Sequence, residues 1–100
     1  MGHLLGRSLM SRPLFQLGQV VATRAVAAHL EQHRIAAAFY LDRHVHGDWG
    51  SVPAEDARAN LSAVAHGARI LSSYDVAGKR VWIITEADRR MTTLLFSSEY

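Results

Sequence analysis

Cysteine is absent from this chain of 100 residues, and no apolar stretch approaches the roughly 20 residues that a membrane-spanning helix needs. Without cysteine the protein has no disulfide, no thiolate zinc site, no iron–sulfur cluster and no cysteine nucleophile. No continuous apolar core of a signal peptide is recognisable, so we expect a cytoplasmic protein that does not bind membranes. The sequence also lacks a nucleophile and base at a diagnostic spacing, and we therefore expect no cofactor, no metal and, on balance, no enzyme.

Lysine is also scarce, because arginine supplies ten of the eleven basic residues, and the formal net charge is only +2. Arginine is the better bidentate partner for phosphate and carboxylate groups. The arginines are spread along the chain, however, and form no run of the kind found in nucleic-acid-binding tails, so a GC-rich genome explains them more simply. Composition therefore leaves both a protein and a nucleic acid open as the partner, and it is compatible with a homodimer.

Two segments in the first half of the chain have the apolar spacing of helices. Thr23 is suited to cap a helix over residues 24–34, in which Val26 and Leu30 fall on one face. Residues 36–45 repeat the helical spacing, and a glycine follows that would end the helix.

The clearest helical pattern lies between Ser51 and Gly67. Pro53 and two acidic residues suit its first turn, and Gly67 suits its end. Helical spacing predicts a buried stripe of Ala57, Leu61, Val64 and Ala68.

After Gly67 the pattern changes to alternation, which predicts strands over residues 69–76, 79–87 and 91–96. The connections between them are short enough to force antiparallel hairpins. Residues 13–22 alternate more weakly and are compatible with an extra N-terminal strand.

We therefore predict an α+β fold, in which two to three helices pack on one face of a three-stranded antiparallel β-meander. Residues 13–100 would form this single domain, and residues 1–12 a mobile leader.

The stretch HVHGDWG concentrates side chains that could carry chemistry. In an extended strand His44, His46 and Asp48 would share one side and could bind a metal. On a helix the two histidines point about 200° apart, and the helical pattern before them favours this arrangement. We therefore expect a helix-ending corner that binds no metal, with His44 at the edge of the buried face beside Tyr40 and His46 exposed.

Within the same stretch Asp48 and Trp49 stand between Gly47 and Gly50, as in a turn. An aspartate can accept a hydrogen bond from its own backbone two residues on, and glycines can adopt positive φ. Trp49 then either closes a small core or stands exposed as a binding anchor or a base-stacking surface. The structural role is the more common one.

The segment KRVWIITEADRRMTT carries the second cluster of charged groups. Residues 79–88 place apolar side chains on both faces, as a central strand does. Charged side chains crowd its end: Glu86, Asp88, Arg89 and Arg90. Arg69 on the neighbouring strand is expected nearby. Such neighbours are usually structural ion pairs and less often a catalytic pair.

Several stretches together resemble a family of small bacterial proteins described as hypothetical or plasmid-related. The matching stretches are LGQVVAT at 17–23, RHVHGDWG at 43–50, ED at 55–56, Asn60, GARILSSY at 67–74, WIITEADR at 82–89, TTLL at 92–95 and the terminal EY. The resemblance implies a link to mobile or plasmid DNA but no established activity. Some members are labelled as a type I restriction methyltransferase subunit, yet this chain lacks a glycine-rich turn for S-adenosylmethionine and an aromatic-proline catalytic motif.

Two functional hypotheses follow. The first is a non-enzymatic accessory protein, in a restriction, CRISPR or plasmid-maintenance setting, that binds a protein or a nucleic acid. Its candidate binding residues are Trp49, Asp48, Arg80, Arg89 and Arg90. The alternative is a toxin-like ribonuclease of a toxin–antitoxin pair, in which a base and a phosphate clamp converge at the sheet surface. Its candidate catalytic residues are His46, Glu86, Arg69 and Arg89.

Overall fold

The structure is a computed structural model that describes residues 12–100. Its elements are β1 (Gln19–Ala22), α2 (Arg24–Gln32), α3 (Ala37–Val45), α4 (Ala54–His66), β2 (Ile70–Val76), β3 (Lys79–Thr85), β4 (Met91–Phe96) and the short 3-10 helix η1 (Ser97–Glu99). The expected leader, apart from Arg12, lies outside the described residues. Across the described range, no helix is both long and apolar enough to cross a membrane.

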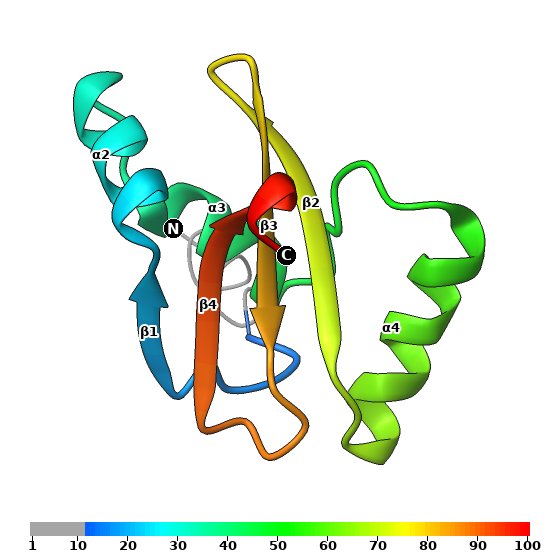
Figure 1. The fold of residues 1–100 in the computed structure, drawn as a ribbon. Coiled ribbons are helices and arrows are strands. Elements are labelled where there is room, and N and C mark those ends of the chain that lie inside the picture. Colours follow the sequence, from blue (N-terminus) through cyan, green and yellow to red (C-terminus); the bar gives the residue numbers. More distant parts are fainter. Residues whose placement is uncertain (1–11) are drawn as a thin grey trace, which may run out of the picture.

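The strands form one four-stranded sheet in the order β1-β4-β3-β2, with β1 and β2 at its two margins (Figure 1). The α+β class is confirmed, and so is the antiparallel meander of β2, β3 and β4. The N-terminal strand exists, but β1 runs parallel to β4, so the sheet is mixed and has four strands. Alternation could not reveal this orientation, because parallel and antiparallel strands share the same two-residue side-chain period.

Helices α2 and α3 cover one face of this sheet (Figure 1). On that face Val26 and Leu30 of α2 pack against Tyr74, Ile83 and Leu94, which come from the three strands of the meander. A second cluster joins α4, the end of α3 and the N-terminal segment; its buried members are Phe15, Val45, Trp49, Ala63 and Ile70. Burial of these side chains supplies the main driving force for folding.

The predicted ends of the first two helices are close to those observed. Thr23 caps α2, because its Oγ1 accepts a hydrogen bond from the Val26 amide at 3.2 Å. Helix α3 ends at Val45, and Gly47 follows with a φ of +86°, which favours glycine. The hairpin between β2 and β3 turns at residues 77–78, both with positive φ, as a two-residue type I′ turn requires.

Helix α4 ends as predicted but faces a different way. Gly67 adopts the left-handed conformation at its C-terminal end, with a φ of +72°. Half of the predicted stripe is confirmed, because Ala57 and Val64 are partly buried against the second cluster. The other half was wrong: Leu61 is 58% exposed, Ala68 is exposed, and the fully buried positions of the helix are Asn60 and Ala63. The reason is that α4 lies beside the edge strand β2, where the amide group of Asn60 pairs with the backbone of Leu71.

The corner after α3 approaches the sheet closely at Gly50. The amide of Ser73 donates to the Trp49 carbonyl oxygen at 2.9 Å, and the amide of Ser51 donates to the Ser73 carbonyl oxygen at 2.7 Å. A Cβ atom added at Gly50 would lie 2.1 Å from that Ser73 oxygen. Only glycine fits there, because the contact is with rigid backbone.

Gly50→Ala and Gly67→Ala form a matched pair, because both glycines have nearly the same φ, +71° and +72°. A Cβ atom at Gly67 meets nothing within 4 Å. We expect Gly67→Ala to lower the free energy of unfolding by about 1 kcal/mol, the cost of a left-handed alanine. Gly50→Ala should lower it by at least about 2 kcal/mol more, because of the clash. Urea unfolding measures both, and equal losses would contradict the close approach.

Candidate functional site

His44 projects from α3 into the sheet and is completely buried, with 0% of its surface exposed. Its Nδ1 lies 2.6 Å from Ser72 Oγ on β2, and its Nε2 lies 2.9 Å from Thr85 Oγ1 on β3. Thr85 Oγ1 lies 2.8 Å from Thr92 Oγ1 on β4, which donates to the Leu17 carbonyl oxygen at 2.7 Å. The expectation that His44 lies at the edge of the buried face was therefore wrong, since its ring links α3 to the sheet interior.

The end of this chain of hydrogen bonds determines its direction. Because Thr92 gives its only hydroxyl proton to Leu17, it accepts from Thr85, and Thr85 in turn accepts from His44. The proton of the neutral imidazole therefore sits on Nε2. Nδ1 is then the acceptor, and it receives the hydroxyl proton of Ser72.

The surroundings of His44 keep the ring neutral. Burial lowers the pKa of His44 to about 4, because a cation would lose its hydration there. The rings of Phe15 and Trp49 stand edge-on to the imidazole, with centroids 5.1 Å and 6.1 Å away. A serine beside a histidine can form a nucleophilic pair, but Ser72 and His44 are both 0% exposed, so no substrate reaches them. The network is structural.

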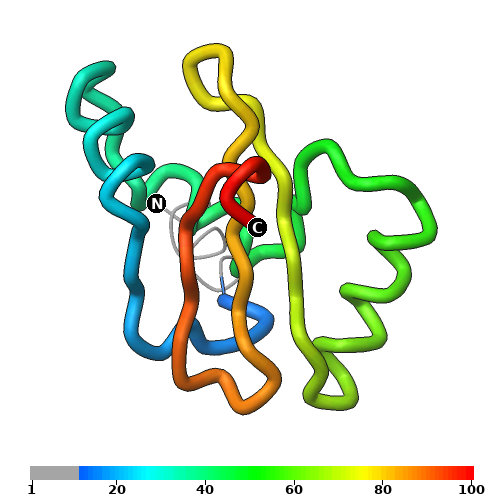
Figure 2. The backbone as a smooth tube through the Cα atoms, in the orientation of Figure 1, coloured from blue at the N-terminus to red at the C-terminus, as the bar shows by residue number. Residues whose placement is uncertain are grey.

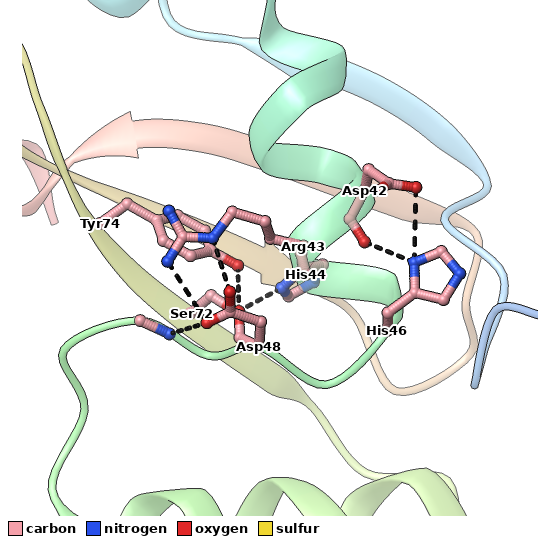
Figure 3. A network of polar contacts seen from close by, with 8 residues as sticks. Asp42, Arg43, His44, His46, Asp48, Ser72 and Tyr74 are labelled. Atoms are coloured by element: carbon pink, nitrogen blue, oxygen red, sulfur yellow. Dashed lines mark hydrogen bonds and ion pairs between the residues drawn. The ribbon is translucent and has the colours of Figure 1, made fainter. Parts of the chain in front are cut away.

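The surface above this network holds an ion pair at the corner after α3 (Figure 3). Arg43 Nε donates to Asp48 Oδ2 at 2.7 Å, and the Arg43 guanidinium lies 4.6 Å from the ring centroid of Tyr74. The hydroxyl of Tyr74 donates to the Asp48 carbonyl oxygen, and the Gly50 amide donates to Asp48 Oδ1 at 3.2 Å. Asp48 thus forms the predicted turn, and its carboxylate is engaged inside the molecule.

These contacts change the acidities of two groups at the corner. The hydrogen bond from Arg43 lowers the pKa of Asp48, because it stabilises the carboxylate. Burial raises the pKa of Tyr74 to about 12. Both groups therefore keep one protonation state around neutral pH, and neither is suited to transfer a proton there.

The two histidines of HVHGDWG point to different places, as the helical period predicts. His46 lies just past the end of α3, partly exposed, with Nδ1 2.7 Å from the Asp42 carbonyl oxygen and 3.4 Å from its carboxylate (Figure 3). Both ring nitrogens of His44 are engaged by hydroxyl groups. Within residues 12–100, no three histidine or acidic side chains gather closely enough to hold a metal ion.

Trp49 is 6% exposed, and its ring stacks on Phe15 with centroids 6.3 Å apart. The structural interpretation of this residue is therefore the correct one. An exposed anchor or base-stacking surface at Trp49 is not compatible with its burial.

The sheet face opposite α2 and α3 carries a cluster of aromatic and arginine side chains. We call it the front face; its strand residues are Leu71, Arg80, Trp82, Ile84 and Leu95, and Arg69 and Tyr100 lie beside them. Ile84 and Leu95 are buried, whereas Leu71, Arg80 and Trp82 are partly exposed. Tyr100 is 66% exposed, and its ring centroid lies 5.3 Å from that of Trp82. Its hydroxyl accepts a hydrogen bond from Arg69 Nη1 at 2.8 Å.

Two of the candidate catalytic residues meet on this face. Arg69 Nε lies 3.7 Å from Glu86 Oε1, and both side chains are about half exposed, at 48% and 46%. His46 lies elsewhere, at the end of α3 beside Asp42. The structure therefore brings Glu86 and Arg69 together and leaves the histidine out of the group.

Arg89 ties the turn between β3 and β4 to the end of α4. Its Nη1 donates to the carbonyl oxygens of Ala68 at 2.6 Å and Glu86 at 3.0 Å, and its Nη2 donates to that of Ala63 at 2.8 Å. The guanidinium is thus committed to the fold. Its neighbour Arg90 has a side chain 88% exposed, 4.0 Å from Asp88.

Sequence reasoning missed the partners of His44, the edge pairing of Asn60 and the position of Tyr100. The sequence did contain one signal for the partners of His44. The alternating pattern of the strands places three hydroxyl side chains at inward positions: Ser72, Thr85 and Thr92. A buried hydroxyl needs a hydrogen-bond partner, so this pattern predicts a polar group facing them. The contacts of Asn60 and Tyr100 join distant segments and leave no local pattern.

The chain matches no protein-family model, and comparison with curated proteins and with solved structures finds no match either. The function is therefore inferred from the geometry of the described residues.

We expect the free energy of unfolding to fall as the pH is lowered from about 6.5 to about 4. Over this range the unfolded chain protonates His44 while the folded protein keeps it neutral, so the unfolded state binds more protons. The shift corresponds to a loss of about 3 kcal/mol at the acidic end. Denaturant unfolding at a series of pH values, with an NMR titration of the imidazole, measures both quantities.

His33→Gln, at the exposed end of α2, serves as the control and should leave this pH dependence intact. Protonation of Asp48 also lowers the free energy of unfolding, but only below its ordinary pKa of 3.8, outside the pH range of 6.5 to about 4. A folded-state pKa of His44 close to 6.5 would contradict the neutral network.

Proposed function

We propose that the protein is a non-enzymatic accessory module that binds another protein through the front face of its sheet. The observation that carries this proposal is the cluster of Trp82, Tyr100 and Arg69 on the face that α2 and α3 leave uncovered. Tryptophan, tyrosine and arginine are the residue types that contribute most to protein–protein binding energy. A rigid cluster of this kind loses little side-chain entropy on binding.

The cluster is held in place before any partner arrives. The Tyr100 ring has two neighbours: its centroid lies 5.3 Å from that of Trp82 and 5.5 Å from Cζ of the Arg69 guanidinium. The preceding turn is held by Glu99, whose Oε1 accepts from the Phe96 amide at 2.8 Å and from Thr23 Oγ1 at 2.9 Å. A preorganised aromatic group of this kind fits the centre of an interface.

The charges on the front face favour a protein over a nucleic acid. Arg69 lies 3.7 Å from Glu86, and Arg80 lies 3.7 Å from Asp75, so each guanidinium has a carboxylate beside it. Nucleic-acid binding depends on unbalanced positive charge that displaces counterions from phosphates. A surface whose charges cancel in pairs suits a partner with an apolar, nearly uncharged contact area.

We place this module in the cytoplasm, in a restriction, CRISPR or plasmid-maintenance setting. This setting rests on the sequence resemblance alone. Of the candidate binding residues, Arg80 lies on the front face and Arg90 is exposed, whereas Trp49, Asp48 and Arg89 are engaged within the fold.

Tyr100→Ala tests the proposal, with Phe39→Ala on α3 as the matched control because both rings are largely exposed, at 66% and 62%. Tagged wild-type protein should recover a reproducible protein partner from its native host, identified by mass spectrometry. Tyr100→Ala should weaken the affinity for that partner at least about tenfold, because it removes about 1.4 kcal/mol or more of binding energy. Phe39→Ala should bind like the wild type.

Recovery of no reproducible protein would count against the proposal, and so would equal binding by Tyr100→Ala. Recovery of nucleic acid that salt releases steeply would identify the other class of partner.

The pair of Glu86 and Arg69 favours a second candidate, a toxin-like ribonuclease. The half-exposed carboxylate could accept a proton from a ribose hydroxyl, and the guanidinium 3.7 Å away could bind the phosphate. The Tyr100 hydroxyl, 2.8 Å from Arg69, would lie beside the same phosphate.

Under this second candidate, induced expression should arrest growth and degrade cellular RNA. Glu86→Gln should relieve both effects because it removes the base, whereas His46→Gln should relieve neither because His46 lies just past the end of α3 beside Asp42. Growth curves and electrophoresis of total RNA measure the outcome. Normal growth with intact RNA would remove the ribonuclease.

A further inference from the structure

The margin of the sheet formed by β2 is covered by two different groups. The side-chain amide of Asn60 donates to the Leu71 carbonyl oxygen at 2.8 Å and accepts from the Leu71 amide at 3.2 Å. Further along, the Ser73 amide and carbonyl pair with Trp49 and Ser51. These contacts occupy the outward backbone groups of Leu71 and Ser73, through which another strand could pair with the first part of β2.

The other margin, β1, has no such cover in the described part of the chain (Figure 2). Its parallel ladder with β4 uses the odd-numbered residues, since the Gln19 amide donates to Arg90 and the Thr23 amide donates to Leu94, each at 2.9 Å. In such a ladder alternate residues point their backbone groups to opposite sides. The amides and carbonyls of Val20 and Ala22 therefore point away from the sheet.

The composition of β1 offers no protection against pairing. Its sequence, QVVA, contains no charge and no proline, and Val20 is 42% exposed. Natural edge strands usually carry a lysine, a proline or a bulge that prevents such pairing. The β2 margin is thus blocked at Leu71 and Ser73, whereas β1 presents free backbone hydrogen-bonding groups beside an exposed valine.

We propose that β1 pairs with β1 of a second copy of this chain, antiparallel about a twofold axis at Val21. In this register the backbone amide and carbonyl of Val20 pair with those of Ala22 in the second copy. The twofold axis generates the equivalent pair, Ala22 with Val20 of the second copy. Four backbone hydrogen bonds form, and the two sheets become one continuous sheet.

The side chains of β1 are complementary to themselves in this register. Val21 faces its own copy, the larger Val20 faces the smaller Ala22, and Gln19 faces Thr23. Arg24, the nearest charged residue, already belongs to α2 and lies outside the paired strands, so no like charges oppose each other between them. The pairing therefore has no electrostatic penalty of the kind that specific edge strands use to prevent it.

The wild-type protein should behave as a dimer in sedimentation equilibrium. Val20→Lys should raise the dissociation constant at least about tenfold, because it places two like charges at the interface. Leu61→Lys, on the exposed face of α4, is the matched control and should leave the dimer unchanged. Circular dichroism should show that both variants remain folded.

Amide hydrogen exchange locates the interface independently of any variant. The Val20 and Ala22 amides should exchange more slowly as protein concentration rises, while the Val21 amide, which bonds to β4, is protected at every concentration. A wild-type monomer at all concentrations would overturn the proposal. A dimer in which the Val20 and Ala22 amides remain unprotected, or one that Val20→Lys leaves intact, would also overturn it.

The two proposals can fail separately. Tyr100→Ala alters the front face and leaves β1 untouched, so it should remove the protein partner without changing sedimentation. Val20→Lys should dissociate the dimer without changing the affinity for the protein partner.

Discussion

The imidazole of His44 uses both of its nitrogens to join α3 to the sheet. The hydrogen bonds continue through Thr85 and Thr92 to the backbone of Leu17, so one helix, three strands and the N-terminal segment share a single polar chain. Each member has a partner, and no buried side-chain nitrogen or oxygen in the described residues lacks one. Removing one member would leave its neighbour buried and unpaired, which costs more than one hydrogen bond contributes.

The corner after α3 follows from this constraint. Because His44 holds the last turn of α3 against β2, the chain must reverse within a few residues, and Gly50 brings its backbone against Ser73. The same reversal places Trp49 in the core and Asp48 beside Arg43. A stretch rich in histidine, aspartate and tryptophan is thus used for architecture, and the exposed aromatic cluster lies on the opposite face of the sheet.

Local physical rules explain what could be predicted from the sequence. Thr23 caps a helix because its hydroxyl reaches an amide three residues on, and a glycine ends a helix because it tolerates positive φ. Short connections force hairpins, so the meander of β2, β3 and β4 was predicted almost to its observed ends. The proximity of Glu86 and Arg69 followed from the same pairing, because Arg69 directly precedes β2 and Glu86 directly follows the adjacent strand β3.

The sequence by itself therefore determined the helices, the hairpins and the α+β class, since these depend on residues close together in the chain. Only the tertiary structure decided the parallel pairing of β1 with β4, the partners of His44 and the pairing of Asn60 with Leu71. Each of these joins segments far apart in sequence. A side-chain period states which residues face inward, but not which distant group they meet there.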